Sequence, residues 1–231
     1  MKSSEDILKY SSEALTGDVD LSVKYESLKR FVTRTIDIVG SIVGIIILAP
    51  VILLVIVINY VNKDFAPIFF VQKRIGKDGK EFKMIKFRTM IVGAEDILEK
   101  YLQENKDIRD EYLTTKKLKN DPRVTKAGKL LRKTSLDEFP QFLNILKGNM
   151  TLVGPRPYLP REKEDMGEYY EYISTLKPGI TGPWQVSGRS NISFDERLKI
   201  DMEYYYNKTI KEDMKIVLKT VAKTIKCDGA V

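Results

Sequence analysis

The 231-residue sequence contains no histidine, one cysteine and one tryptophan. Because histidine is the usual proton shuttle and the commonest metal ligand, its absence excludes Ser-His-Asp and Cys-His catalysis. The single cysteine, Cys227, cannot form an internal disulfide, and no cysteine cluster exists to hold structural zinc. A reducing compartment therefore suits the soluble part of the chain. Any acid, base or nucleophile must be a carboxylate, a lysine, a tyrosine or this thiol.

Common phosphate-binding motifs are missing too. The segment from Gly76 to Lys80 lacks the spacing and the hydroxyl residue of a P-loop, and no G-x-G-x-x-G sequence opens a helix. The chain is nevertheless basic, with 39 lysines and arginines against 32 acidic residues and a formal charge of +7. This charge favours an anionic partner, such as a phosphorylated substrate or lipid head groups. We expect no nucleic acid partner, since no aromatic-basic recognition motif accompanies the charge.

One long apolar run stands out, because no charged side chain occurs between Ile38 and Ile58. At about 1.5 Å per residue, such a run is long enough to cross a hydrocarbon core of about 30 Å. Pro50 lies near its middle and removes one helical hydrogen bond, which predicts a sharp bend. Basic residues flank both ends, so both ends favour the cytoplasmic side. The residues alone leave two alternatives open, a kinked single-pass anchor and a re-entrant hairpin.

We expect three regions along the chain. Residues 1–35 combine a loosely held polar tail with an amphipathic helix that starts near Leu21. Residues 36–62 form the membrane element, bent at Pro50. Residues 63–231 form a compact mixed domain that belongs to the catalytic or binding part of the protein.

The pattern within this domain predicts short strands followed mostly by helices and loops. Two aromatic-rich runs, 69–74 and 82–88, predict a β-hairpin. Residues 94–106 favour a helix, and residues 129–147 favour helix with an interruption at Pro140. Loops rich in proline and glycine follow. Near the C-terminus a basic amphipathic helix suits either a membrane surface or packing on the domain; its apolar face consists of Met214, Val217, Leu218, Val221, Ala222 and Ile225.

The acidic pair Asp137 and Glu138 is the first candidate for chemistry. Ser135 and Glu138 have the spacing of a capping box, and acidic residues are favoured in a first helical turn, so both carboxylates have an ordinary structural explanation. The surroundings favour more, because Arg132 precedes the pair closely and Arg156 lies between two prolines. Arginines near a helix N-terminus form a natural anion site. In such a field Asp137 would stay ionised at neutral pH and could attack phosphorus.

Six blocks of the sequence, taken in order, resemble the monotopic polyprenyl-phosphate phosphoglycosyl transferases, the bacterial sugar transferase family. The resemblance covers nearly everything from Lys29 to the C-terminus, and six ordered blocks are far more specific than any one of them. The blocks are FVQKRIG at 70–76, KFRTM at 86–90, LRKTSLDEFPQ at 131–141, LKGNM at 146–150, VGPRP at 153–157, and KPGITG at 177–182 followed by QVSGR at 185–189.

This resemblance implies transfer of a sugar 1-phosphate from a UDP-sugar to undecaprenyl phosphate, as the first membrane step of capsule, exopolysaccharide or other glycan assembly. By the family pattern Asp137 attacks the phosphate nearest the sugar, expels UMP and forms a covalent phosphosugar intermediate, which the lipid phosphate then attacks. Glu138 completes the dyad. A Mg²⁺ ion beside Asp137 would screen the repulsion between the nucleophile and the diphosphate. The expected phosphate-binding residues are Lys86, Arg88, Arg132 and Arg156, with Arg189 at the nucleotide and Asp201 as a further functional acidic position.

The family also implies a fold and a place in the cell. The expected fold is a small α/β domain with interfacial amphipathic helices behind a re-entrant helix-break-helix. The family bends this helix at a Ser-Pro pair, whereas this chain has Ala49 before Pro50, so proline alone provides the bend. The implied location is the bacterial inner membrane, with the catalytic domain on the cytoplasmic face, membrane lipids as partners and a homo-oligomer as a possible state.

A different class of function stays open at this point, that of a membrane-anchored basic binding module without catalysis. In such a module the acidic pair would only cap a helix, and Asp137→Asn would leave every activity untouched. The residues do not identify the transferred sugar.

Overall fold

A computed structural model describes residues 4–115, 118, 121–187 and 192–226. The chain divides into two compact units, Met1–Ile36 and Asp37–Val231. The first unit is helical from Ser4 onward, as the first part of helix α1 (Ser4–Val61). The second unit, called the C-terminal unit below, contains the rest of α1 and all other elements. The remaining description concerns this unit.

Helix α1 differs from the sequence prediction in two ways. It already begins at Ser4, where we expected a loose tail, because no proline interrupts these first residues and a single glycine only weakens a helix. It also continues through Pro50 without the predicted break. Leu48 and Val51, on either side of the proline, are buried in one apolar cluster, and this packing holds the helix together across the missing hydrogen bond. The re-entrant arrangement therefore stays a prediction, although α1 within Lys24–Val61 is long and apolar enough to cross a membrane.

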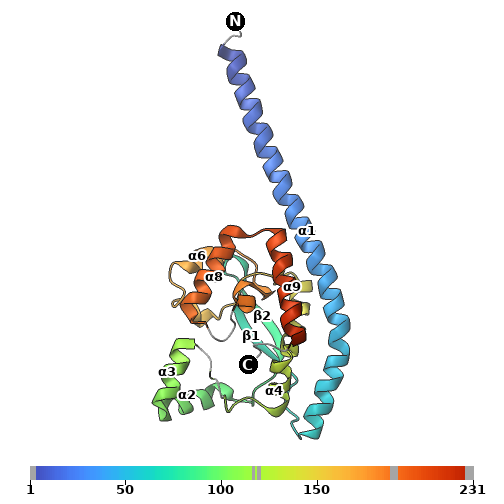
Figure 1. The fold of residues 1–231 in the computed structure, drawn as a ribbon, viewed down its shortest axis with the longest axis vertical. Helices are drawn as coiled ribbons and strands as arrows, with labels where there is room; N and C mark the ends of the chain where they lie inside the picture. The colour runs from blue at the N-terminus through green and yellow to red at the C-terminus, as the bar shows by residue number, and fades with distance from the viewer. Residues whose placement is uncertain (1–3, 116–117, 119–120, 188–191, 227–231) are drawn as a thin grey trace. The chain divides into compact units, whose positions relative to one another are not determined.

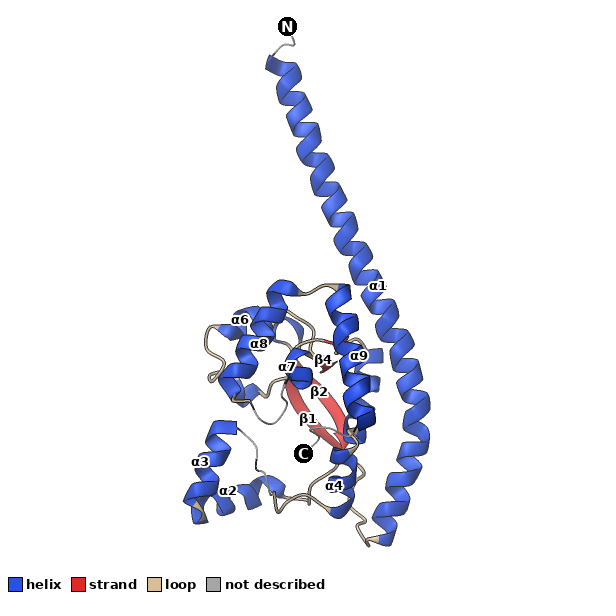
Figure 2. Cartoon of the chain, in the orientation of Figure 1, coloured by secondary structure: helices blue, strands red, loops and turns tan. Residues whose placement is uncertain are grey.

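Two small sheets lie in the C-terminal unit (Figures 1 and 2). The predicted hairpin is confirmed: β1 (Phe69–Ile75) and β2 (Glu81–Phe87) pair antiparallel, with Phe69 opposite Phe87. The loop between them contains the short 3₁₀ helix η1 (Lys77–Gly79), where Gly79 has a positive φ of 72°. The second sheet was not predicted, because each strand has only three residues: β3 (Thr151–Val153) pairs parallel with β4 (Gly179–Thr181).

Helices surround the hairpin and supply most of the fold (Figure 2). The unit is thus a mixture of helices with small sheets. After α1, the helices of the described chain are α2 (Ala94–Glu104), α3 (Lys106–Thr115), α4 (Lys126–Lys133), η2 (Leu136–Gln141), α5 (Phe142–Leu146), η3 (Pro160–Glu162), α6 (Tyr169–Ile173), α7 (Pro183–Ser187), α8 (Phe194–Asn207) and α9 (Ile210–Lys226).

The segment 129–147 contains parts of three helices, not one helix interrupted at Pro140. The interruption falls earlier, at Ser135, whose φ of 56° is incompatible with a continuing helix. Pro140 lies inside η2, where the tighter and shorter winding tolerates a residue without a backbone N–H. The strained turn at Ser135 redirects the chain immediately before the acidic pair.

Buried polar contacts fix the elements that carry the site. Asn144, 1% exposed, donates its side-chain amide to the carbonyl of Lys83 at 2.7 Å and accepts from the backbone N–H of Ile85 at 3.0 Å. It therefore ties α5 to strand β2. At the start of the apolar run, Asp37 Oδ1 accepts hydrogen bonds from Thr151 Oγ1 and the backbone N–H of Leu152, both at 2.8 Å. Since buried carboxylates need such partners, this contact fixes α1 to β3.

Candidate functional site

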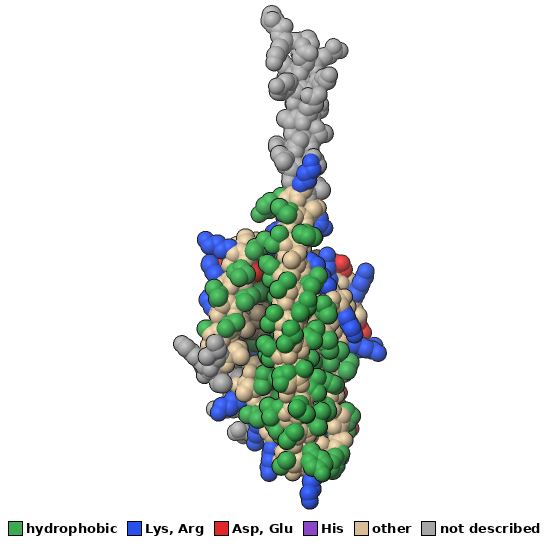
Figure 3. All heavy atoms as spheres, turned by 90° about the vertical axis from the view of Figure 1, so that its right-hand side faces the viewer, with side chains coloured by type: hydrophobic (Ala, Val, Ile, Leu, Met, Phe, Trp, Pro, Cys, Tyr) green, Lys and Arg blue, Asp and Glu red, His purple; other side chains and the backbone are tan. Residues whose placement is uncertain are grey.

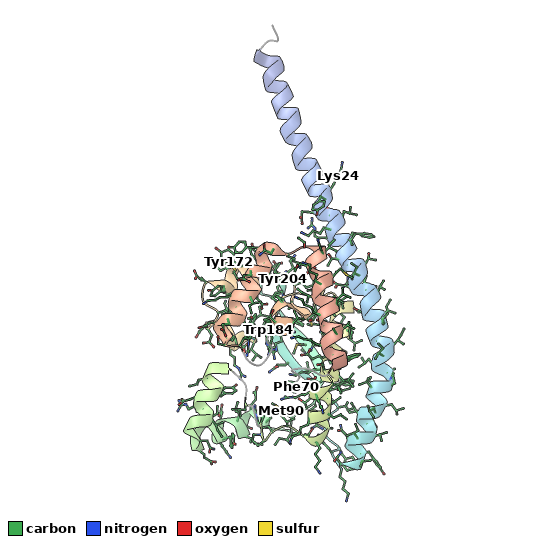
Figure 4. The ribbon with its side chains drawn as sticks, viewed as in Figure 1. Lys24, Phe70, Met90, Tyr172, Trp184 and Tyr204 are labelled. Carbon is green, nitrogen blue, oxygen red and sulfur yellow. The ribbon has the colours of Figure 1, made fainter. Side chains whose placement is uncertain are left out.

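A cavity of about 1560 Å³ opens in the C-terminal unit between the hairpin, η2, α2, α7 and α9. Phe70, Met90 and Trp184, which are labelled in Figure 4, lie in its wall. The wall also contains most of the residues singled out from the sequence, namely Lys86, Arg88, Arg132, Asp137, Glu138 and Arg156. Residues that lie far apart in the sequence are thus brought to one cavity.

The acidic pair lies in the first turn of η2, directly after the Ser135 turn. The capping box proposed for Ser135 and Glu138 does not form: Ser135 adopts the left-handed conformation, and its side chain makes no capping hydrogen bond. The capping-box explanation is therefore wrong, although both carboxylates do lie in a first helical turn, as the other ordinary explanation requires. Their side chains are available to the cavity instead.

Burial and charge act in opposite directions on Asp137. Burial raises its pKa, the neighbouring Glu138 carboxylate raises it further, and Lys86 and Arg132 lower it; the result is a pKa of about 7. The sequence led us to expect that arginines would keep this carboxylate fully ionised at neutral pH. Instead, desolvation and like-charge repulsion outweigh the cations, as is typical of adjacent buried carboxylates. At a pKa near 7 a large fraction of the Asp137 carboxyl groups is ionised at neutral pH, although burial disfavours the ionised form. A carboxylate of this kind is a candidate for a reactive group.

Two cations lower the pKa of Asp137 through their charge. Lys86 lies in strand β2, and its Nζ is 5.4 Å from the ring centroid of Phe70. Burial, reinforced by nearby arginines, lowers the pKa of Lys86 to about 8. Arg132 lies at the end of α4, where its Nε donates to Thr89 Oγ1 at 3.0 Å. Thr89 therefore directs the Arg132 side chain at the cavity without neutralising its charge.

The loop around Arg156 is held from both sides. Arg74, 4% exposed, donates Nη1 to the carbonyl of Pro157 at 2.9 Å. Asp201 Oδ2 accepts from Tyr158 Oη at 2.8 Å and from the backbone N–H of Arg156 at 3.4 Å. Asp201 is fully buried in α8, and burial raises its pKa to about 7, partly offset by these two hydrogen bonds. The structure thus places Asp201 behind the cavity wall, as a partner of the Arg156 loop.

An aromatic ring also contacts the Arg156 side chain. The Arg156 guanidinium carbon lies 5.6 Å from the ring centroid of Trp184, and that of Arg197 lies 5.0 Å from the same ring. Trp184 is 2% exposed and forms part of the cavity wall. Sequence reasoning missed the roles of Arg74, Tyr158 and Trp184. Arg74 was visible inside a recognised block, and Trp184 as the single tryptophan, but neither position revealed its distant partner.

Two further predictions have different outcomes. Arg88 lines the cavity, yet its guanidinium donates to Asp64 Oδ1 at 2.8 Å, to Pro67 O at 2.7 Å and to Met90 O at 3.0 Å. These contacts give Arg88 a structural explanation at the exit of α1. Arg189, expected at the nucleotide, lies outside the described residues, as does Cys227.

An acidic-basic pair that the sequence did not single out lies elsewhere in the cavity wall. Arg123 donates Nε and Nη2 to the two oxygens of Asp121, at 2.8 and 2.6 Å, and Nη1 to the carbonyl of Ala94 at 3.2 Å. Such a two-bonded pair is among the stronger side-chain interactions. It anchors the start of α2, which forms one wall of the cavity.

The residues present fit a magnesium ion. Mg²⁺ prefers oxygen ligands and is usually bound by one or two carboxylates, substrate phosphates and water. Asp137 and Glu138 offer two adjacent carboxylates in the cavity wall, and their repulsion leaves a demand for positive charge. Among the described residues no group of three metal-ligating side chains exists, so the remaining ligands would have to come from substrate and water.

Comparison with known proteins decides the family. Residues 28–227 match the model of the bacterial sugar transferase family. The chain belongs to this family. Its relatives include a "UDP-galactose-lipid carrier transferase" of Erwinia amylovora, 43% identical over 201 residues, which are 87% of this chain and 42% of that protein. Another is an "undecaprenyl-phosphate galactose phosphotransferase" of Salmonella typhimurium, 42% identical over 87% of this chain and 42% of that protein.

The family assignment confirms the resemblance seen in the sequence blocks. The chain spans less than half the length of these two relatives. A shorter relative, the "exopolysaccharide production protein ExoY" of Rhizobium meliloti, is 39% identical over 188 residues, covering 81% of this chain and 83% of that protein. The family match contains the acidic pair, the Arg156 loop and the apolar part of α1 together.

Proposed function

We propose that this protein is a phosphoglycosyl transferase that moves a sugar 1-phosphate from a UDP-sugar to undecaprenyl phosphate. The observation that carries the proposal is the gathering of Asp137, Glu138, Arg132, Arg156 and Lys86 in the wall of one cavity. The names of several relatives support the donor and the acceptor, including a "UDP-glucose:undecaprenyl-phosphate glucose-1-phosphate transferase" of Escherichia coli. Relatives named for exopolysaccharide production support a role in glycan assembly.

In the proposed first step a carboxylate oxygen of Asp137 attacks the phosphorus nearest the sugar. A new P–O bond to the aspartate forms, and the bond between that phosphorus and the UMP oxygen breaks, so UMP leaves with the electron pair. Arg132 and Arg156 stabilise charge on the transferring phosphoryl group, and Lys86 keeps part of the Asp137 population ionised. Covalent catalysis divides one difficult transfer into two easier ones.

In the second step an oxygen of the lipid phosphate attacks the same phosphorus and releases Asp137. Glu138 is placed to accept a proton from the incoming phosphate when that group arrives protonated. A Mg²⁺ ion held by Asp137 and Glu138 would supply neutralising charge for the diphosphate. A cavity of about 1560 Å³ exceeds the usual volume of a single small-molecule site, roughly 300–1,000 Å³, which suits two substrates.

Mass spectrometry tests the reaction. After incubation with a UDP-sugar and Mg²⁺, without lipid, the intact protein should release UMP and gain the mass of one phosphosugar. Chelation of Mg²⁺ should suppress both signals. If Asp137→Asn gains the same mass, Asp137 is not the nucleophile. A panel of UDP-sugars in the same assay would identify the donor.

We further propose that α1, which is continuous through Pro50 in the structure, bends at Pro50 in the bacterial cytoplasmic membrane and anchors the chain as a re-entrant hairpin, with the C-terminal unit on the cytoplasmic face. The support is the apolar length of α1 and the basic residues on both flanks of the run. Single cysteines at Ser27 and Asn62, in a Cys227→Ser background, should label from the same side. Labels on opposite faces would show that α1 spans the membrane.

A further inference from the structure

The cavity has more than one kind of wall. One is charged and contains the acidic pair with its arginines. Another is an apolar part near α1 and α9, called the apolar arm here; it consists of Phe142, Leu152, Ile180, Val217 and Val221. A polar sugar nucleotide alone would not need a wall made of these apolar side chains.

Hydroxyl groups do line the arm, but they already bond one another. Thr181 Oγ1 and Thr220 Oγ1 are 2.7 Å apart, and Thr220 Oγ1 also bonds the carbonyl of Ile216 at 2.8 Å. Thr224 Oγ1 donates to the carbonyl of Thr220 at 2.9 Å. Sugar and nucleotide hydroxyls placed here would lose hydrogen bonds to water and gain few in return. The arm therefore favours an apolar occupant.

On one side, the arm is separated from α1 by a single layer of side chains. A Cβ added at Gly44 would overlap the ring of Phe142, and one added at Gly40 would lie 2.7 Å from Leu152 Cδ1. The opposite face of α1 carries exposed apolar side chains, among them Val43 and Ile46, and Figure 3 shows this apolar face. The arm thus lies directly beneath the part of the molecule best suited to lipid.

On the other side, the arm continues onto the surface along α9. Val217 is half-buried in the wall, whereas Val221 lines the cavity and is 51% exposed. Met214 and Leu218 lie beside them on the same helix, 45% and 66% exposed, and do not line the cavity. An apolar stripe of this kind marks a surface that contacts lipid or a ligand. Val221 therefore marks the point where the cavity meets that surface.

We infer that the apolar arm binds the isoprenoid chain of the lipid phosphate, with the first isoprene units against Phe142, Leu152 and Val217 and the chain leaving the cavity over Val221. This inference rests on the proposed function. It gives the acceptor a path from the membrane to the acidic pair that does not pass through the charged wall used by the donor. Recognition of the acceptor then depends on chain length as well as on phosphate.

The test compares two substitutions to asparagine on one helix. Val221→Asn places an amide at the mouth of the arm, and Leu218→Asn places the same amide on the exposed stripe outside the cavity. In detergent micelles, Val221→Asn should raise the KM for undecaprenyl phosphate about tenfold, a loss of roughly 1.4 kcal/mol. It should leave the KM for geranyl phosphate, which is too short to reach Val221, within about twofold. Leu218→Asn should change neither value.

Release of UMP without any lipid separates this inference from the proposed function. If the wild type releases UMP, the proposed chemistry stands. The KM values for undecaprenyl phosphate and geranyl phosphate then test the role of the apolar arm by themselves. Equal effects of Val221→Asn on both acceptors, or no effect on undecaprenyl phosphate, would overturn the inference. So would a raised KM for the UDP-sugar in Val221→Asn, because the arm would then belong to the donor.

Discussion

Asp137 and Asp201 both have a pKa of about 7 that burial raises, yet their surroundings differ. Asp137 lies in an open cavity among charges, next to a second carboxylate. Asp201 is fully buried and accepts hydrogen bonds from a tyrosine hydroxyl and a backbone N–H. A ligand can displace or complement the charges around Asp137, whereas nothing can enter beside Asp201. Equal pKa values thus belong to the proposed reactive centre in one case and to a contact that holds the Arg156 loop in the other.

The largest expected effect is that of Asp137→Asn. This change should reduce UMP release about a thousandfold or more, since a nucleophile acts together with its whole site. It should also stabilise the protein above pH 7. Because the folded pKa lies above the ordinary value of 3.8, the native state favours the protonated carboxyl, and the associated stability is lost progressively as pH rises from about 4 to about 7.

Thermal unfolding measures this second effect. At pH 8 we expect the asparagine variant to unfold a few degrees higher, corresponding to about 1–2 kcal/mol in a chain of this size. At pH 4 or below, near the ordinary pKa of 3.8, the difference should nearly vanish. A variant that is inactive but less stable at pH 8 would show that Asp137 is held by its cations and not penalised by burial.

The pH dependence of the wild type should give the next largest effect. The rate constant kcat/KM for UMP release should rise with pH and level off above about 7, so at pH 6 it should be about a tenth of the plateau. Stopped-flow or quenched assays without lipid, at Mg²⁺ concentrations too low to saturate the protein, isolate this step, because bound Mg²⁺ would favour the carboxylate form of Asp137. If kcat/KM does not change between pH 5 and 8, the nearby arginines keep the pKa of Asp137 low and the carboxylate ionised, as the sequence predicted.

Tyr158→Phe tests the positioning centre. The change removes the hydroxyl that donates to Asp201 at 2.8 Å, which should cost roughly 1.5–3 kcal/mol of stability because the acceptor is a buried carboxylate. By loosening the Arg156 loop, it should lower kcat/KM for the UDP-sugar about fivefold, mainly through KM. The exposed tyrosine variant Tyr172→Phe serves as control. If kcat/KM is unchanged in Tyr158→Phe, the hydrogen bond between Tyr158 and Asp201 does not position the Arg156 loop for the reaction.

The smallest effect is expected for Asp64→Asn. It removes the ion pair with Arg88 at 2.8 Å, a contact outside both centres. Stability should fall by about 1–2 kcal/mol, because the Arg88 side chain is largely buried but an amide can still accept its hydrogen bond, and UMP release should stay within about twofold, since Arg88 keeps its two carbonyl partners. If UMP release falls more than tenfold, Arg88 does bind phosphate, as the sequence predicted.

Local signals in the sequence predicted the hairpin, the apolar run and the acidic pair, because each depends on neighbours in the chain. These local signals failed where contacts between residues far apart in the sequence determine the structure. The turn at Ser135 overrides a capping-box pattern, and the three-residue strands β3 and β4 form only because their segments meet in the fold. The pKa of Asp137 could not be predicted either, since it depends on burial that no spacing reveals.

The close approach of Gly44 to Phe142 restricts how this protein can be assembled. A side chain at that glycine has no room, so the helix fits the rest of its unit in a single rotational setting. An unrelated apolar helix of the same length and hydrophobicity would insert in a bilayer equally well but would not seat on the unit. We therefore expect chimaeras with foreign anchors to reach the membrane and still fold poorly, unless small residues are kept at Gly40 and Gly44.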